Sequence, residues 1–159
     1  MKSRPVSAQI VWGHDRVADE GHDGDVRVIF ASGKHQRWTR NGKCLQPRVS
    51  NSGLVGWTHG KAYHSKGALM NATLVLARGN KILRRIAAYY PFIEVWDFTE
   101  HDTRVVMLSR GPHGPGRLEK FRIKDGAFLD GCFESRSEEW PKWARSFVEK
   151  TSAEGTYLE

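Results

Sequence analysis

Short strand-turn-strand units follow one another along most of this chain, and they constrain its fold more than any other feature. Each unit has two apolar-rich edges around a polar turn, as in residues 47–57, where residues 51–53 read Asn-Ser-Gly. Asn41-Gly42 is a second strong turn signal, because a type I′ turn needs a positive φ at both central positions. Repeated hairpins of this kind predict antiparallel β-structure.

The expected hairpins cover most of the middle of the chain and leave two irregular segments, 59–71 and 109–116. The pairs that we expect are 26–30 with 36–39, 48–50 with 54–58, 73–77 with 81–86, 92–98 with 104–109, and 118–123 with 127–133.

One helix is expected near the end of the chain, over residues 137–150. Apolar residues there fall at positions i, i+3, i+4, i+7 and i+8, which makes one apolar stripe. They are Trp140, Trp143, Ala144, Phe147 and Val148.

The 159 residues fit a single domain, 1–159, that is large enough to bury a core. Within it we expect an irregular N-terminal segment (1–25), β-meander repeats (26–133) and the C-terminal amphipathic helix. The predicted fold class is therefore all-β, mainly an antiparallel meander, with one C-terminal helix.

The chain is basic, with a formal charge of +7 and a pI near 9.6. This balance favours contact with nucleic acid, anionic lipid or an acidic protein. The Lys and Arg residues are spread along the chain, so a solvated basic surface without a partner remains an alternative. Aromatic and basic residues alternate at 37–40, and residues 84–85 and 89–90 read Arg-Arg and Tyr-Tyr, which supports weak nucleic-acid binding at most.

No membrane span and no signal peptide are expected in this chain. Its longest apolar run is far shorter than the ~18 residues that a membrane-spanning helix needs, and no apolar stretch follows Met1-Lys2-Ser3-Arg4.

The two cysteines, Cys44 and Cys132, belong to no Cys-x-x-Cys motif, so a zinc site built on thiolates is not expected. They are either two separate thiols or one long-range disulfide. A disulfide would close the meander and would require an oxidising compartment.

Two groups of residues could carry binding or chemistry. Carboxylates and imidazoles crowd one Gly-rich loop, whose weak candidate metal ligands are His14, Asp15, His22, Asp23 and Asp25. The two irregular segments supply candidate binding residues, because loop rims often carry function: His59, Tyr63, His64, Arg110 and His113.

Sequence motifs for catalysis are not found. The chain has no Gly-x-Ser-x-Gly elbow, no Gly-x-Gly-x-x-Gly and no P-loop. No cofactor is expected, and a non-enzymatic role is favoured over an enzymatic one.

The hairpin at 47–57 resembles those of TolB-type β-propeller blades, in which a Ser-Pro-Asp-Gly turn leads into a strand closing on Trp. Asn51-Ser52 stands here in place of the usual Pro-Asp, and residues 94–98 with 104–107 repeat the pattern more loosely. The resemblance extends to WD-repeat blades and covers about residues 27–133. Because a closed propeller needs four or more blades, it implies an incomplete propeller, a curved meander or a small sandwich.

The resemblance extends to small bacterial envelope proteins with blade-like hairpins, which implies a periplasmic or secreted location; the cytoplasm is the alternative. The leading hypothesis is a non-enzymatic β-rich interaction module that binds a protein partner or itself. A nucleic-acid-binding domain and a metal-dependent hydrolase are the two alternative functions.

Overall fold

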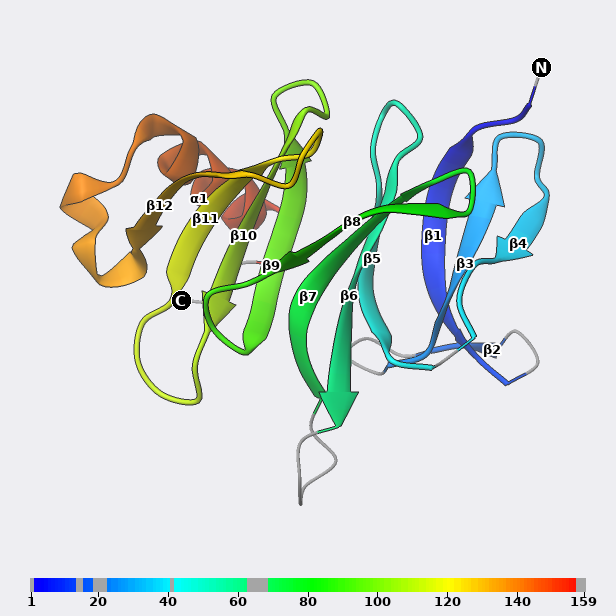
Figure 1. Cartoon of the computed structure of the whole chain (residues 1–159), viewed down its shortest axis with the longest axis horizontal. Helices are drawn as coiled ribbons and strands as arrows, with labels where there is room; N and C mark the ends of the chain where they lie inside the picture. The colour runs from blue at the N-terminus through cyan, green and yellow to red at the C-terminus, as the bar shows by residue number, and fades with distance from the viewer. Residues whose placement is uncertain (1, 14–15, 19–22, 41, 63–68, 157–159) are drawn as a thin grey trace. The chain divides into compact units, whose positions relative to one another are not determined.

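The computed structural model describes residues 2–13, 16–18, 23–40, 42–62 and 69–156, which form a mostly β protein with one C-terminal α-helix (Figure 1). The expected all-β class is confirmed. The strands are β1 Pro5–Trp12, β2 Arg16–Val17, β3 Asp25–Phe30, β4 His35–Arg37, β5 Cys44–Val49, β6 Val55–Ala62, β7 Leu69–Arg78, β8 Lys81–Ala87, β9 Phe92–Thr99, β10 Arg104–Arg110, β11 Arg117–Arg122 and β12 Phe128–Phe133, and the helices are a 3-10 helix, Glu134–Glu139, and α1, Lys142–Ala153.

The chain divides into two compact units, Met1–Ala87 and Ala88–Glu159, where the sequence suggested one domain. The N-terminal unit holds sheet A, in the order β2-β1-β3-β4, and sheet B, in the order β5-β6-β7-β8. The C-terminal unit holds sheet C, in the order β12-β11-β10-β9, together with α1. All strand pairs are antiparallel, and the five hairpins expected from the sequence are all present.

The core of the N-terminal unit lies between sheets A and B. Strands alternate their side chains between two faces, and the inward residues of both sheets meet in one apolar cluster: Ile10, Val26 and Val28 from sheet A, and Cys44, Val55, Trp57, Val75 and Ala77 from sheet B.

The N-terminal segment corrects one expectation, because residues 5–12 form a regular strand. Strand β1 is eight residues long and pairs along β3, with Ala8 opposite Val28 and Ile10 opposite Val26. The pairing with β3 holds this segment in an extended conformation.

The C-terminal helix also begins later than expected. Pro141 disfavours a helical conformation in the residue before it, and Trp140 is indeed extended, with φ −62° and ψ 130°. Residues 134–139 therefore form a separate 3-10 helix, and α1 starts at Lys142. Its apolar stripe packs on sheet C, where Ala144 and Phe147 are buried.

Asp25 is the polar centre of the N-terminal unit. Its carboxylate, only 5% exposed as a residue, accepts hydrogen bonds from Arg37 (2.7 Å), the Thr39 hydroxyl (2.9 Å) and the Gly42 amide (2.9 Å). Burial by itself would raise the pKa of Asp25. The hydrogen bonds and the Arg37 charge outweigh burial and hold this pKa below its usual range. The carboxylate thus ties the start of β3 to β4 and to the segment that leads into β5.

Within the part of the chain that the structure describes, no helix has the length and apolar character needed to cross a membrane.

We predict that Asp25→Ala lowers the free energy of unfolding by roughly 3 kcal/mol, because it leaves Arg37 and two other donors without their acceptor. Since the folded-state pKa lies below the unfolded one, this stabilisation is present above about pH 4 and is lost as the pH falls through the folded pKa. Urea titrations at pH 7 and pH 3 measure both effects. Asp23→Ala, at an exposed carboxylate two residues away, is the matched control, and an equal loss in both variants would contradict the role of Asp25.

Candidate binding groove

The binding residues expected from the sequence do not form one described site. His59 lies inside strand β6 and not on a loop, with Cys44 and Thr73 as its neighbours across the sheet. Burial, together with the charges of Lys43 and Arg85, lowers the pKa of His59, which favours its neutral form. Tyr63 and His64 lie outside the described residues.

Arg110 and His113 belong to the C-terminal unit and differ in their surroundings. His113 is exposed in the segment between β10 and β11. Arg110, at the end of β10, is engaged by two carboxylates: its Nε donates to Glu94, and its terminal nitrogens form a bidentate pair with Glu134, in which Nη2 lies 2.7 Å from Oε2. The Arg110 guanidinium thus holds β9 and the 3-10 helix to the end of β10, which is a structural role.

The candidate metal ligands give no metal site in the described residues. His14, Asp15 and His22 lie outside them, Asp23 is exposed, and the oxygens of Asp25 are occupied by Arg37, Thr39 and Gly42. No group of three or more His, Cys, Asp or Glu side chains suited to a metal ion occurs among the residues that the structure describes.

The two cysteines do not form a disulfide in the structure. Cys44 is buried in the core between sheets A and B, while Cys132 packs against the apolar cluster under α1. Burial raises the pKa of each thiol to about 11. Both thiols are therefore protonated at neutral pH and unsuited to nucleophilic chemistry.

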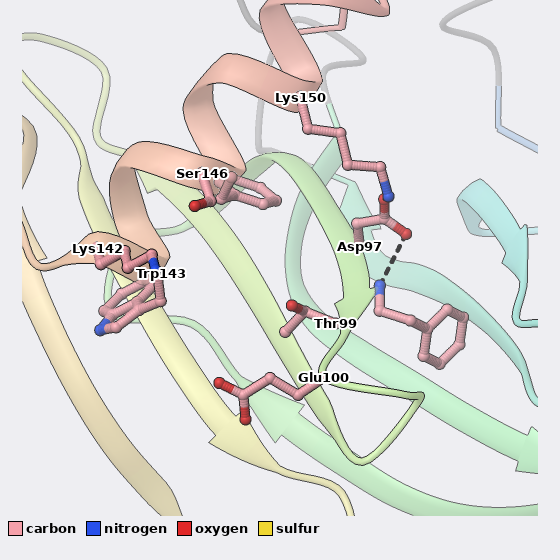
Figure 2. A pocket seen from close by; sticks show the side chains of 9 residues that line it. Asp97, Thr99, Glu100, Lys142, Trp143, Ser146 and Lys150 are labelled. Atoms are coloured by element: carbon pink, nitrogen blue, oxygen red, sulfur yellow. Dashed lines mark hydrogen bonds and ion pairs between the residues drawn. The ribbon is translucent and has the colours of Figure 1, made fainter.

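A groove of about 460 Å³ runs between α1 and the β9 edge of sheet C (Figure 2). The helix contributes one wall, because Lys142, Ser146 and Lys150 are spaced by four residues and so share one helical face. Strand β9 and the turn after it contribute the opposite wall with Asp97, Thr99 and Glu100. The apolar lining consists of Phe98, Trp143 and Phe147.

The two carboxylates of the groove are neutralised by neighbouring cations. Asp97 accepts from Lys150 (2.6 Å) and from the backbone amide of Phe98 (2.7 Å). Glu100 lies 3.1 Å from Lys120 and 3.5 Å from Arg104.

Lys142 differs from the other charged residues of the groove. Its side chain is exposed, and among the described residues no carboxylate pairs with it. The groove consequently offers one uncompensated positive charge beside an apolar surface.

Trp143 is held in one orientation. Its indole N–H donates to Asp130 (2.8 Å), and the Lys120 ammonium lies 5.5 Å from its ring centroid, within the range of a cation–π contact. A ring fixed in this way presents a flat apolar surface at low entropic cost.

The turn that carries Glu100 has an unusual backbone. Glu100, His101 and Asp102 have φ values of 51°, 55° and 64°, a left-handed conformation that non-glycine residues rarely adopt. The Glu100 carbonyl accepts from the amide and the hydroxyl of Thr103, which stabilises the turn. Strained backbone of this kind concentrates at functional sites.

None of the groove residues was singled out from the sequence as a binding residue. The spacing of Lys142, Ser146 and Lys150 was the available signal, because it places a basic stripe beside the apolar one. Without the structure, that stripe reads as an ordinary solvated helix face.

A scan against protein-family models finds no family that matches the chain, and a search of curated proteins finds no significant match.

We predict that Ellman's reagent detects no fast-reacting thiol in the native protein at pH 7.5, because a thiol with a pKa of about 11 is almost entirely protonated there. After denaturation without a reductant, two thiols per chain should react. No reactive thiols after denaturation would establish a disulfide in solution and contradict the structure.

Proposed function

We propose that this protein is a non-enzymatic interaction module whose C-terminal unit binds an extended segment of a protein partner in the groove between α1 and β9. The observation that carries the proposal is the uncompensated charge of Lys142 beside the apolar surface of Trp143 and Phe147. Ligand sites are typically concave and mostly apolar, with a few placed polar groups, and this groove has that composition.

The chemistry of the groove favours a segment in which an acidic residue neighbours an apolar one. A carboxylate gains a charge-assisted contact with Lys142, and an apolar side chain is buried against Trp143. The hydroxyls of Thr99 and Ser146 offer further hydrogen bonds to a peptide backbone.

Two further features support an interaction role over an enzymatic one. The cysteine thiols are protonated, and the described residues contain no metal-ligating cluster.

Sheets B and C each have four antiparallel strands in sequential order, the number found in one propeller blade, in keeping with the resemblance of the hairpins. A periplasmic or secreted location rests on that resemblance alone, since the structure lacks the disulfide that would argue for export.

We predict that blocked hexapeptides in which Glu and Leu alternate bind the groove. The variant Lys142→Glu should weaken this binding about tenfold, equivalent to about 1.4 kcal/mol, because residue 142 then repels the peptide carboxylates that the lysine attracts. Fluorescence anisotropy of labelled peptides measures the affinity, and the NMR signal of the Trp143 indole N–H reports the place of binding.

Lys124→Glu, which makes the same charge change at another exposed lysine of the same unit, should leave the affinity unchanged. Peptides with Lys in place of Glu should bind at least tenfold more weakly. Equal losses in the two variants, or an unshifted Trp143 signal at saturation, would overturn the proposal.

The distribution of charge favours a second function, binding of a polyanion such as nucleic acid by the N-terminal unit. Residues 1–87 contain 15 of the 25 Lys and Arg residues but only five of the 18 Asp and Glu residues, which gives a formal charge of +10. Residues 88–159 contain ten Lys and Arg residues and 13 Asp and Glu residues, which gives a formal charge of −3. Charge asymmetry between parts of a chain is typical of contact with nucleic acid. Strand β8, at the edge of sheet B, exposes Lys81 and Arg85.

We predict weak, sequence-independent binding of single-stranded oligonucleotides, with a dissociation constant above about 1 µM that rises steeply with salt. The double variant Lys81→Glu/Arg85→Glu should reduce the affinity and flatten the salt dependence, as measured by anisotropy at several NaCl concentrations. The double variant Lys124→Glu/Arg145→Glu changes the net charge equally from the C-terminal unit. If it has the same effect, binding follows net charge alone and the N-terminal unit is not the site.

A further inference from the structure

Arg117 lies at the centre of a group of aromatic rings in the C-terminal unit, apart from the groove. It begins β11 and is paired with Phe133 of β12. Its guanidinium carbon is 4.7 Å from the ring centroid of Phe133, 4.8 Å from that of Tyr89 and 5.9 Å from that of Phe128. Cation–π contacts at these distances fix the plane of the guanidinium.

The Arg117 cation is not compensated by an acceptor. Its Nε is buried without a hydrogen-bond partner, and among the described residues no carboxylate forms an ion pair with the guanidinium. The neighbouring buried carboxylate, Glu119, instead accepts from the backbone amide of Tyr89 (2.8 Å). A partly buried arginine whose donors lack acceptors is costly, and an anion that accepts from them removes that cost.

The rings around Arg117 are unusually accessible for aromatic side chains. Tyr89 is 58% exposed and Phe128 is 51% exposed. Exposed large apolar side chains that gather in one place are typical of a binding site.

Gly131 makes room for the guanidinium on β12. A Cβ at this position would lie 2.7 Å from Nη2 of Arg117 and 3.1 Å from the ring of Phe128. Because the strand lacks a side chain here, the guanidinium can extend across β12 toward the edge of the sheet.

A pocket of about 350 Å³ lies at that edge, between β12 and the 3-10 helix, and Arg117 is one of its lining residues. Arg136 adds a second guanidinium, which forms an exposed ion pair with Glu139 (3.7 Å), and Glu139 also lines the pocket. The Asp130 carboxylate also lines the pocket, but it already accepts from Trp143 and from the Gly131 amide.

We propose that Arg117 is the anchor of an oxyanion-binding site at the β12 edge, which takes a carboxylate or phosphate group through the fork of the guanidinium. Planar guanidinium groups bind both anions with two parallel hydrogen bonds. The surrounding rings supply apolar contact for whatever the anion is attached to. The site is separate from the groove, although Asp130 of its lining accepts a hydrogen bond from Trp143 of the groove.

The test is a titration of the full chain with sodium phosphate or sodium acetate, each against sodium chloride at equal ionic strength. The side-chain Nε–H signal of Arg117, identified by its loss in Arg117→Lys, is the readout in a ¹H–¹⁵N NMR spectrum. We expect a saturable shift with a dissociation constant of about 1 mM, as is reasonable for a site with one main contact. A shift with phosphate alone assigns a phosphate group, and a shift with acetate alone assigns a carboxylate.

Three variants separate the site from general electrostatics, with binding followed by the backbone amide signals of residues 131 and 133. Arg117→Lys keeps the charge but lacks the fork, and should weaken binding at least tenfold. Gly131→Ala leaves Arg117 in place but displaces its guanidinium, and should weaken binding as well. Arg122→Lys, on the same strand, should bind like the original chain. No saturable shift with either anion up to about 50 mM, or an equal loss in Arg122→Lys, would overturn the proposal.

Discussion

The C-terminal unit depends on the packing of α1 against one face of sheet C. Phe147 and Ala144 are buried there against the inward residues of three neighbouring strands: Val95, Val106, Leu108 and Leu118. Burial of apolar surface contributes about 25 cal/mol per Å² and has no directional preference, so it holds the helix to the sheet without occupying polar groups. Both proposed sites follow from it, since the groove borders β9 at one edge of the sheet and the oxyanion pocket borders β12 at the other.

The two edges of sheet C are protected by the same arrangement. At β9, the Asp97 carboxylate accepts from the next backbone amide and from Lys150 of α1. At β12, the Asp130 carboxylate accepts from the next backbone amide and from Trp143 of α1. Edge strands with unsatisfied backbone groups invite pairing with other chains, and these carboxylates satisfy one such group at each edge while they anchor the helix. The residues that protect the edges are thus the ones that shape the two pockets.

Polar interactions have different roles in the two units. In the N-terminal unit, the buried Asp25 gathers Arg37, Thr39 and Gly42 around one carboxylate, and this unit has a formal charge of +10. In the C-terminal unit the acidic residues outnumber the basic ones, and the two cations on which the proposed sites rest, Lys142 and Arg117, have no ion pair among the described residues. A single net charge for the whole chain conceals this separation.

Elements that depend on neighbouring residues were predictable from the sequence: all five hairpins and the apolar stripe of α1, because turn geometry and helical periodicity are local properties. Strand β1 was missed, because its pairing with β3 makes it a strand. The helix begins later than expected, because Pro141 disfavours a helical conformation at Trp140. The sites were not predictable. Arg110 reads as a binding residue in the sequence, but its guanidinium pairs with Glu94 and Glu134. The only signal for Lys142 was its spacing along one helix face, and Arg117 gave none. The sequence determines which charged groups exist, but whether a charge has a partner depends on residues from distant segments, which only the tertiary structure brings together.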